Sequence, residues 1–205
     1  MTRRKLVLAS SSPYRKMLLQ RLGIAFDVRA PEIDETPLHG ESFEATAVRL
    51  AREKATAIAQ MVDADHVVIG SDQVAHCEGV RLDKPGTEEN ALLQLLHQRG
   101  KQAFYHSAVC VISDGGKKVQ EICITTVVRF RDASQLTEDV LRAYLAIEKP
   151  LNSAGSAKSE GLGIALIESI ACDDPTALIG LPLIRLCDLL KNAGIHIFNT
   201  TTSAA

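Results

Sequence analysis

The chain has 205 residues, of which 46% are hydrophobic, and its formal net charge is −2. This length suits one large domain or two small lobes with a substantial core. The near-neutral charge gives no general attraction for a nucleic-acid polymer, so any attraction for phosphate has to be local. Tryptophan is absent and aromatic residues make up only 4%, which argues against an extended base-stacking surface.

The cysteines and the apolar runs indicate in which cellular compartment the protein is expected. The five cysteines form no CxxC pair and no zinc-ligand spacing with histidine, so we expect reduced thiols in a cytoplasmic protein. The basic residues 1–5 precede only a short apolar run, residues 6–9, which cannot form the core of a signal peptide. No later run is long enough to span a bilayer, so we expect no membrane partner.

Residues 5–9 are predicted to form a strand that leads through a serine-rich loop into a helix. Ser12 is a good N-cap and Pro13 suits the first helical position. Arg15 and Lys16 place cations in the first helical turn, where they oppose the helix dipole. An anionic ligand would compensate them and accept the free N–H groups. Two solvated surface cations are the alternative.

An acidic loop follows a second predicted strand, residues 24–30. The loop, residues 31–37, is bounded by prolines and carries Glu32, Asp34 and Glu35. Carboxylate oxygens at this density can hold a hard cation such as Mg²⁺, which keeps several of its water ligands. A solvated acidic loop is the alternative.

A long helix is predicted over residues 42–61, because its apolar residues recur at the helical spacing. Lys54 lies near its middle, and the plain interpretation is a solvated lysine whose salt-bridge partner is Glu53 or a neighbouring turn. The stretch 67–74 then runs from β-branched residues into Gly-Ser-Asp-Gln, which predicts a buried strand that ends at Asp72. Gly70 would let a phosphate or a metal approach the backbone. An ordinary aspartate turn is the alternative.

The remaining elements predict a mixed sheet. Lys84 precedes a proline and is therefore held in an extended backbone. The patterns predict a hairpin over 74–83 that turns at 78–79, a helix capped by Thr87, and antiparallel strands over 102–113 and 117–131 joined at 114–116. Further along they predict a helix over 137–147, a strand over 161–168, a turn over 173–176, a helix over 181–193 and a frayed tail over 199–205.

Cations and carboxylates recur where these elements begin or end. The polar candidates are Ser10, Arg15, Glu35, Lys54, Asp72 and Lys84. Phosphate-ester chemistry needs cations or a metal to neutralise the phosphate oxygens, and a carboxylate to position or deprotonate water. No Cys-His or Ser-His pairing supports a covalent route, so direct attack by water is favoured. Residues 155–159 resemble half of a P-loop, but Ala157 replaces its second glycine and no apolar strand precedes them.

Several stretches, in matching order and spacing, resemble the Maf family of nucleoside triphosphate pyrophosphatases. The resemblance covers almost the whole chain and rests on residues 8–15, 33–37, 52–55, 70–74, 83–85, 154–161 and 180–182. The Gly-Ser-Asp-Gln and Lys-Ser-Glu-Gly sequences are similar to the branch that acts on 7-methyl-GTP. The branch that acts on dTTP and UTP has a glutamine where Glu160 stands. Related members often have Trp in place of Tyr14 and Arg in place of Lys16.

The resemblance implies an α/β fold with a mixed, curved sheet flanked by helices and two lobes around a central cleft, as in Maf and ITPase proteins. A single domain over 1–198 and a homodimer are implied with it. The implied activity is a cytoplasmic, Mg²⁺- or Mn²⁺-dependent hydrolysis between the α and β phosphates of a nucleoside triphosphate. The implied site consists of Asp72 as proton acceptor, Glu35 and Asp72 as metal ligands, Ser10, Arg15, Lys54 and Lys84 for the phosphates, and Tyr14, Gln73 and Glu160 for substrate choice.

The preference for a methylated guanine has a physical rationale. N7-methylation makes the guanine ring cationic, and a cationic ring gains from stacking on the aromatic face of Tyr14. Glu160 could accept from the N1–H and the exocyclic amine, a donor pair that uracil lacks. The alternative is that Glu160 only pairs with Lys158. A broader house-cleaning pyrophosphatase and a nucleotide-binding regulator of cell division remain the alternative functions.

Overall fold

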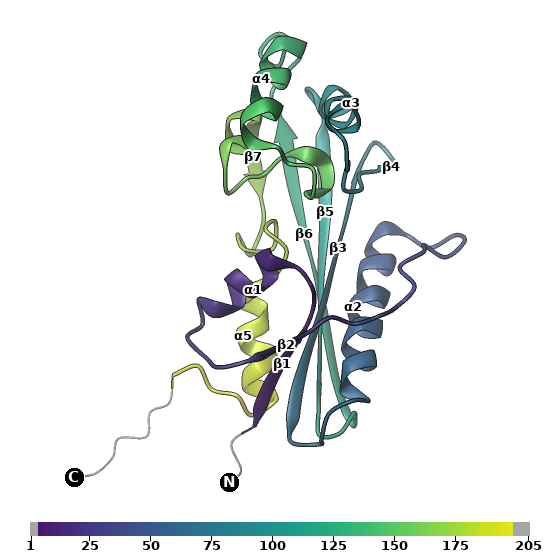
Figure 1. The fold of residues 1–205 in the computed structure, drawn as a ribbon, viewed down its shortest axis with the longest axis vertical. Coiled ribbons are helices and arrows are strands. Elements are labelled where there is room, and N and C mark those ends of the chain that lie inside the picture. The colour runs from purple at the N-terminus through teal and green to yellow at the C-terminus, as the bar shows by residue number, and fades with distance from the viewer. Residues whose placement is uncertain (1–3, 199–205) are drawn as a thin grey trace, which may run out of the picture.

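A computed structural model describes residues 4–198, which form an elongated molecule around one seven-stranded mixed sheet (Figure 1). The strand order is β2-β1-β3-β5-β6-β7, and β4 pairs with the end of β3. Strand β1 is parallel to β2 and β3, and the other pairs are antiparallel. The strands are β1 (Lys5–Ala9), β2 (Asp27–Arg29), β3 (His66–Cys77), β4 (Val80–Arg81), β5 (Gln102–Ser113), β6 (Lys118–Phe130) and β7 (Ile167–Ala171).

Helices cover both faces of this sheet. The α-helices are α1 (Pro13–Gln20), α2 (Phe43–Ala59), α3 (Glu88–Gln98), α4 (Glu138–Glu148) and α5 (Leu183–Asn192), and the short 3₁₀ helices are η1 (Ala154–Ser156) and η2 (Leu162–Leu166). Within residues 4–198, none of the helices is both long and apolar enough to cross a bilayer. The expected tail, 199–205, lies outside the described residues.

Side-chain caps start most of these helices, and those at Ser12 and Thr87 were predicted from the sequence. Ser12, Ser42, Thr87 and Thr137 each accept the backbone N–H of the third residue along. Such a cap satisfies one of the N–H groups that a helix start leaves free. Helix α5 differs, because Pro182 stands at its N-cap and supplies no side-chain acceptor.

Three long strands, β3, β5 and β6, run through two lobes (Figure 1). In one lobe the sheet is covered on one face by α1 and α5 and on the other by α2. Val67 and Ile69 enter the first of these cores, while Val68 and Val74 enter the second, as alternation along a strand requires. The other lobe packs α3 and α4 on the far ends of the long strands around a third core.

The two hairpins were predicted correctly, but some strand boundaries were not. Strand β3 does not end at Asp72, because its pairing with β5 continues to the partners Cys77 and Ala103. Asp72 therefore lies within a strand, opposite Ala108. The expected strand over 161–168 was wrong: η2 precedes β7 there. A Cβ at Gly163 would lie 2.5 Å from backbone atoms of Lys158, so this segment folds tightly on the preceding loop.

Candidate active site

The site begins with the close packing of α2 on β3. A Cβ at Gly70 would lie 2.2 Å from the carbonyl oxygen of Ala51 and 2.6 Å from the backbone nitrogen of Ala55. No side chain fits between strand and helix, so glycine is required for this contact. The expectation that Gly70 leaves room for phosphate or metal is wrong, because α2 fills that room. The contact instead brings Lys54 of α2 against Asp72 of β3.

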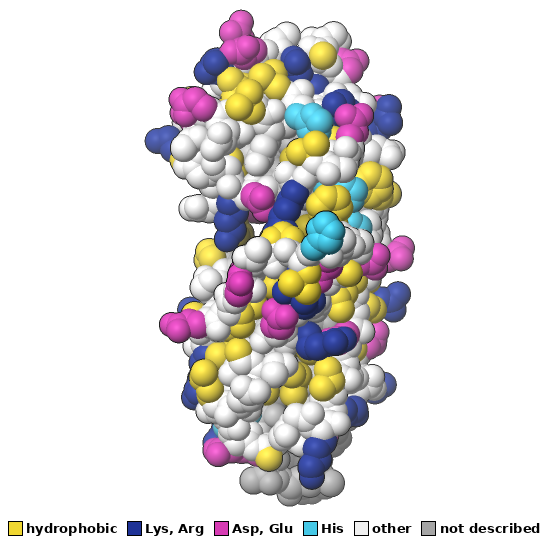
Figure 2. All heavy atoms as spheres, turned by 90° about the vertical axis from the view of Figure 1, so that its right-hand side faces the viewer, with side chains coloured by type: hydrophobic (Ala, Val, Ile, Leu, Met, Phe, Trp, Pro, Cys, Tyr) yellow, Lys and Arg dark blue, Asp and Glu magenta, His cyan; other side chains and the backbone are white. Residues whose placement is uncertain are grey.

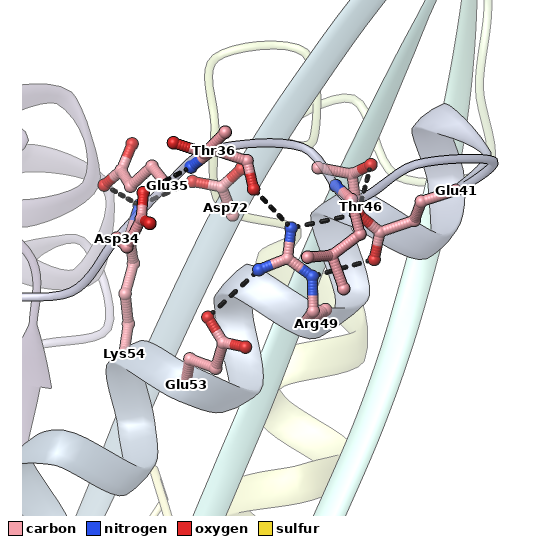
Figure 3. Close-up of polar contacts among 10 residues, drawn as sticks. Asp34, Glu35, Thr36, Glu41, Thr46, Arg49, Glu53, Lys54 and Asp72 are labelled. Atoms are coloured by element: carbon pink, nitrogen blue, oxygen red, sulfur yellow. Dashed lines mark hydrogen bonds and ion pairs between the residues drawn. The ribbon is translucent and has the colours of Figure 1, made fainter.

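The ammonium group of Lys54 joins two carboxylates that are far apart in the sequence. Its Nζ lies 2.6 Å from Asp72 Oδ1 and 2.7 Å from Glu35 Oε1 (Figure 3). Lys54 and Asp72 are each only 6% exposed. A buried charge is stable only when it is paired, so the two carboxylates hold Lys54 inside the protein. The expected pairing of Lys54 with Glu53 does not form, since Glu53 binds Arg49 instead.

Further cations surround Glu35. Burial acts to raise the pKa of Glu35, but the hydrogen bond and charge of Lys54 and the charges of Lys84 and Arg15 hold that pKa below its usual value. Burial lowers the pKa of Arg15, against the opposing effects of Asp72 and Glu35. These mutual effects place Arg15 and Lys84 within electrostatic range of the carboxylates.

The start of α1 supplies the next part of the site. Arg15 Nε donates to the carbonyl oxygen of Gly180 at 3.0 Å, which fixes the guanidinium against the loop before α5. Ser10 is buried at the end of β1, and its Oγ accepts the N–H of Ser12 at 3.1 Å. The predicted pairing of a serine-rich loop with a cationic helix start is therefore present, and it lies beside Asp72 rather than on an isolated surface.

A cavity of about 120 Å³ lies next to these charges, between the two lobes. Tyr14, Arg15, Gln73, Lys84 and Glu160 all line it. Figure 2 shows the narrowing between the lobes, where Lys and Arg side chains gather at a notch on the left edge. The cleft that the resemblance implied is thus present.

The candidate residues divide between the cavity and the charged cluster beside it. Ser10, Glu35, Lys54 and Asp72 are not part of the cavity lining. Arg15 and Lys84 connect the two parts, because they line the cavity and also act on the pKa of Glu35.

Gln73 is held rigidly at the floor of this cavity. Its Nε2 lies 3.0 Å from the carbonyl oxygens of Ala177 and Leu178 and 2.8 Å from Ser107 Oγ. With its nitrogen engaged in this way, the amide oxygen is the group that Gln73 can offer to a ligand.

The sequence reasoning missed the segment that supplies these carbonyls. Asp174 is fully buried, and its carboxylate accepts the N–H of Thr176 at 3.1 Å and that of Ile184, in the first turn of α5, at 2.7 Å. Asp174 thus provides the cap that Pro182 lacks and fixes residues 174–184 as one unit. The Asp-Asp-Pro-Thr sequence predicted only a turn, and no local pattern links Asp174 to a helix that starts well beyond it.

Glu160 is carried by a segment that α4 holds in place. Tyr144 Oη donates to the carbonyl oxygen of Ser156 at 3.1 Å and accepts the N–H of Lys158 at 3.2 Å. Burial, assisted by negative neighbours including Glu160, raises the pKa of Tyr144 to about 12. Lys158 Nζ lies 3.3 Å from Glu148 Oε1, so the ion pair of Lys158 is with α4 and not with Glu160.

Of the three carboxylates in the acidic loop, Glu35 reaches the buried cluster. Asp34 instead accepts the N–H of Thr36 at 2.9 Å, which closes a local turn. Lys54 engages one oxygen of Glu35 and one of Asp72, and the second oxygen of each is the kind of ligand that Mg²⁺ or Mn²⁺ prefers. The donor set therefore fits a hard divalent cation that keeps several waters.

A second acidic group lies elsewhere. In the described part of the chain, Asp63, Asp65 and His66 bring their ligand atoms within 4.8 Å of one another. They stand at the start of β3, and Asp72 is six positions beyond His66 along the strand, roughly 20 Å away at the usual rise per residue. This group is not part of the cleft.

The fold and the site define an α/β protein with a charged cleft between two lobes. A family model described as Maf-like protein matches residues 5–193. A 7-methyl-GTP pyrophosphatase from Burkholderia thailandensis is 53% identical over 203 residues, which cover 98% of this chain and 93% of that protein. One from Paraburkholderia xenovorans is 54% identical over 192 residues, which cover 93% and 92%. The chain therefore belongs to the Maf-like protein family.

A more distant likeness exists among solved structures. The crystal structure of a nucleoside-triphosphatase, or dITP/XTP pyrophosphatase, from Mycobacterium abscessus aligns with a TM-score of 0.39 and 18% identity, covering 72% of this chain and 96% of that one.

Proposed function

We propose that this chain is a nucleoside triphosphate pyrophosphatase that hydrolyses 7-methyl-GTP to 7-methyl-GMP and diphosphate. The observation that carries the proposal is the pairing of Glu35 with the buried Lys54 and Asp72, beside a cavity lined by Tyr14 and Glu160. The names of the relatives that are more than half identical to this chain support the same substrate. A binding protein would not need a buried carboxylate held ready beside several cations.

Asp72 is the proton acceptor in this reaction. Lys54 fixes the Asp72 carboxylate through Oδ1, and this carboxylate takes the proton of the attacking water. Water adds to the α-phosphorus and the bond from this atom to the bridging oxygen of the β-phosphate breaks. Diphosphate leaves with the electron pair of that bond. A divalent cation held by Glu35 and Asp72 would supply positive charge to the phosphate oxygens.

The chain's own cations bind the triphosphate. Arg15 and Lys84 stand between the cavity and the carboxylates, so a nucleotide with its base in the cavity passes its phosphates between them. The hydroxyl of Ser10 accepts from Ser12 and keeps its own proton to donate to a phosphate oxygen. Lys54 adds positive charge beside Asp72, close to the attacked phosphate, whose oxygens gain negative charge in the transition state.

The cavity side sets the substrate preference. Tyr14 stacks on the cationic methylated ring, and Glu160 accepts from the two guanine donors. The fixed amide of Gln73 presents its oxygen to the base. Since Lys158 pairs with Glu148, the carboxylate of Glu160 is not taken up by that lysine.

A panel of methylated and canonical nucleotides at equal concentration tests the reaction, with diphosphate release measured in the presence and absence of Mg²⁺ or Mn²⁺. We expect 7-methyl-GTP to be hydrolysed fastest. Equal rates for all triphosphates would favour the broader house-cleaning pyrophosphatase. Binding without diphosphate release would favour the nucleotide-binding regulator of cell division.

Asp72→Asn tests the proton acceptor. Loss of the base should lower the turnover number by about 100-fold or more, while circular dichroism shows a folded protein. Asp173→Asn, an exposed aspartate near the same cleft, is the matched control and should keep full turnover. Turnover retained by Asp72→Asn would assign the proton to another group, with Glu35 as the first candidate.

Glu160→Gln tests the base contact. The exchange keeps the size of the side chain but replaces one acceptor oxygen with a donor, so the ratio of kcat/KM for 7-methyl-GTP over GTP should fall by about tenfold. Glu168→Gln, at an exposed carboxylate of β7 that does not line the cavity, should leave the ratio unchanged. An unchanged ratio in Glu160→Gln would remove Glu160 from substrate choice.

A homodimer and a cytoplasmic location remain predictions from the family resemblance. Light scattering of the purified protein measures the first, and cell fractionation measures the second.

A further inference from the structure

Arg49 of α2 binds the loop that carries Glu35 at several points. Its Nε lies 2.8 Å from Glu41 Oε1, and its Nη2 lies 2.9 Å from Glu41 Oε2 and 3.1 Å from the carbonyl oxygen of Thr36. Its Nη1 donates to Glu53 Oε2 at 3.1 Å, which fixes the guanidinium on its own helix. Figure 3 shows Arg49 at the centre of this network.

Glu41 extends the same network into the loop. Its Oε2 also accepts the N–H of Leu38 at 3.2 Å and the hydroxyl of Thr46 at 3.0 Å. Residues 36–41 are therefore closed on themselves and fastened to α2 chiefly by Arg49, with a further hydrogen bond from Thr46 to Glu41. The planar guanidinium can meet a carboxylate and a carbonyl at once, which the ammonium of a lysine cannot do in the same fixed geometry.

Glu35 directly precedes the residue whose carbonyl Arg49 holds. Its own side chain is more than half exposed, and its ion pair with Lys54 is the contact that draws it to Asp72. Helix α2 provides both Lys54 and Arg49, so one rigid element fixes the ammonium and the backbone next to Glu35. The backbone that Arg49 holds at Thr36 is therefore adjacent to the residue whose side chain reaches Lys54 and Asp72.

We propose that Arg49 is a positioning residue that holds residues 34–41 on α2 and thereby keeps the Glu35 carboxylate at the Asp72 site. The consequence for metal binding and turnover rests on the proposed function, whereas the consequence for the loop itself does not.

Arg52 provides a matched comparison on the same helix. It pairs with Glu121 of β6 and makes no described contact with the acidic loop. Its side chain is 57% exposed, against 18% for Arg49. The same substitution at both positions therefore separates loss of an arginine on α2 from loss of the loop attachment.

The experiment compares Arg49→Met, Arg49→Lys and Arg52→Met in the full chain. Hydrogen exchange of the metal-free protein reports the loop directly, at the Leu38 amide. Titration with Mn²⁺ followed by electron paramagnetic resonance reports metal binding without turnover. Diphosphate release from 7-methyl-GTP at increasing Mn²⁺ reports the metal requirement of the reaction. Glu41→Gln weakens the same attachment from the loop side and serves if Arg49→Met does not fold.

We expect Arg49→Met to speed exchange at Leu38 and to raise both the Mn²⁺ dissociation constant and the Mn²⁺ concentration for half-maximal rate, each by about tenfold. Saturating Mn²⁺ should restore most of kcat. For Arg49→Lys, the exchange rate at Leu38 and both Mn²⁺ values should lie between those of Arg49→Met and those of the natural protein. Arg52→Met should match the natural protein in all measurements.

Unchanged exchange and Mn²⁺ binding in Arg49→Met would overturn the proposal, as would equal effects in Arg52→Met. If the natural protein releases no diphosphate, the proposed function fails, but the exchange measurement still decides whether Arg49 holds the loop.

Discussion

Residues 34–41 and residues 174–180 both reach the cleft from outside the sheet, and one charged side chain fastens each of them. Arg49 holds the first through the partly buried carboxylate of Glu41 and is itself fixed by Glu53, whose side chain is 42% exposed. Asp174 holds the second from a fully buried position, and its described partners are backbone N–H groups and the hydroxyl of Thr176. The first segment brings Glu35 to the site, and the second supports Arg15 and Gln73.

The two attachments respond differently to solution conditions. An ion pair near the surface loses strength with salt and with protonation of its acid. A buried carboxylate that accepts N–H groups at the start of a helix is shielded from solvent and gains from the helix dipole. The comparison indicates that the segment beside the nucleobase cavity, residues 174–180, is held firmly. The loop that carries Glu35 is detached from α2 more easily.

The largest expected effect is on the buried attachment. Asp174→Ala leaves the N–H groups of Thr176 and Ile184 without their acceptor inside the protein. The free energy of unfolding should fall by about 3 kcal/mol, the sum of a lost helix cap and buried donors left unpaired. Urea denaturation measures it. Asp173→Ala, the exposed neighbour, should change stability by less than about 0.5 kcal/mol, and a comparable loss there would contradict this account.

The pH dependence of stability probes the attachment by Arg49. The hydrogen bond from Arg49 is the main cause that lowers the pKa of Glu41, from 4.5 to about 2. A carboxyl group whose pKa is lowered on folding stabilises the protein above its unfolded pKa, and this contribution is lost as the pH falls toward the folded pKa.

Glu41→Gln should therefore cost roughly 1 kcal/mol near neutral pH, and the difference from the natural protein should vanish between pH 4.5 and about 2. Urea denaturation at several pH values measures this difference. Glu32→Gln, an exposed carboxylate in the same loop, should show no such trend. A constant difference down to pH 2 would mean that the charge of Glu41 does not stabilise the folded state.

The features of the fold that could be predicted from sequence depend on near neighbours. Caps such as Ser12 and Thr87 act three residues along the chain, and the turn at residues 114–116 joins adjacent strands, so local patterns sufficed. The extent of β3 was missed because its end depends on pairing with β5, which no pattern within residues 67–74 reveals. Gly70 was misinterpreted for the same reason, since the helix that packs on it is distant in the sequence.

The same limit applies to the site. Of the residues that the family resemblance implied, Arg15, Lys84 and Glu160 lie around one cavity, and Glu35 and Asp72 lie in one cluster, while their roles stay predictions. The residues that hold them were not found. Arg49 lies among other charged residues of α2, and any of these could have been solvated, while Asp174 appeared only as part of a turn. Supporting residues are identified by contacts across the fold, which sequence spacing does not encode.

The smallest expected effect, that of salt, separates the two attachments within one molecule. The amides of Leu38 and Ile184 each donate to a carboxylate side chain, Glu41 in one case and Asp174 in the other. Raising NaCl from roughly 0.1 M to roughly 1 M shortens the screening length from about 10 Å to about 3 Å. Hydrogen exchange at Leu38 should then become about twofold faster, because the partly exposed pairs around Arg49 are weakened. Exchange at Ile184 should not accelerate. Equal acceleration at both amides would show that screening does not distinguish them, and that their different burial has no consequence for how firmly each segment is held.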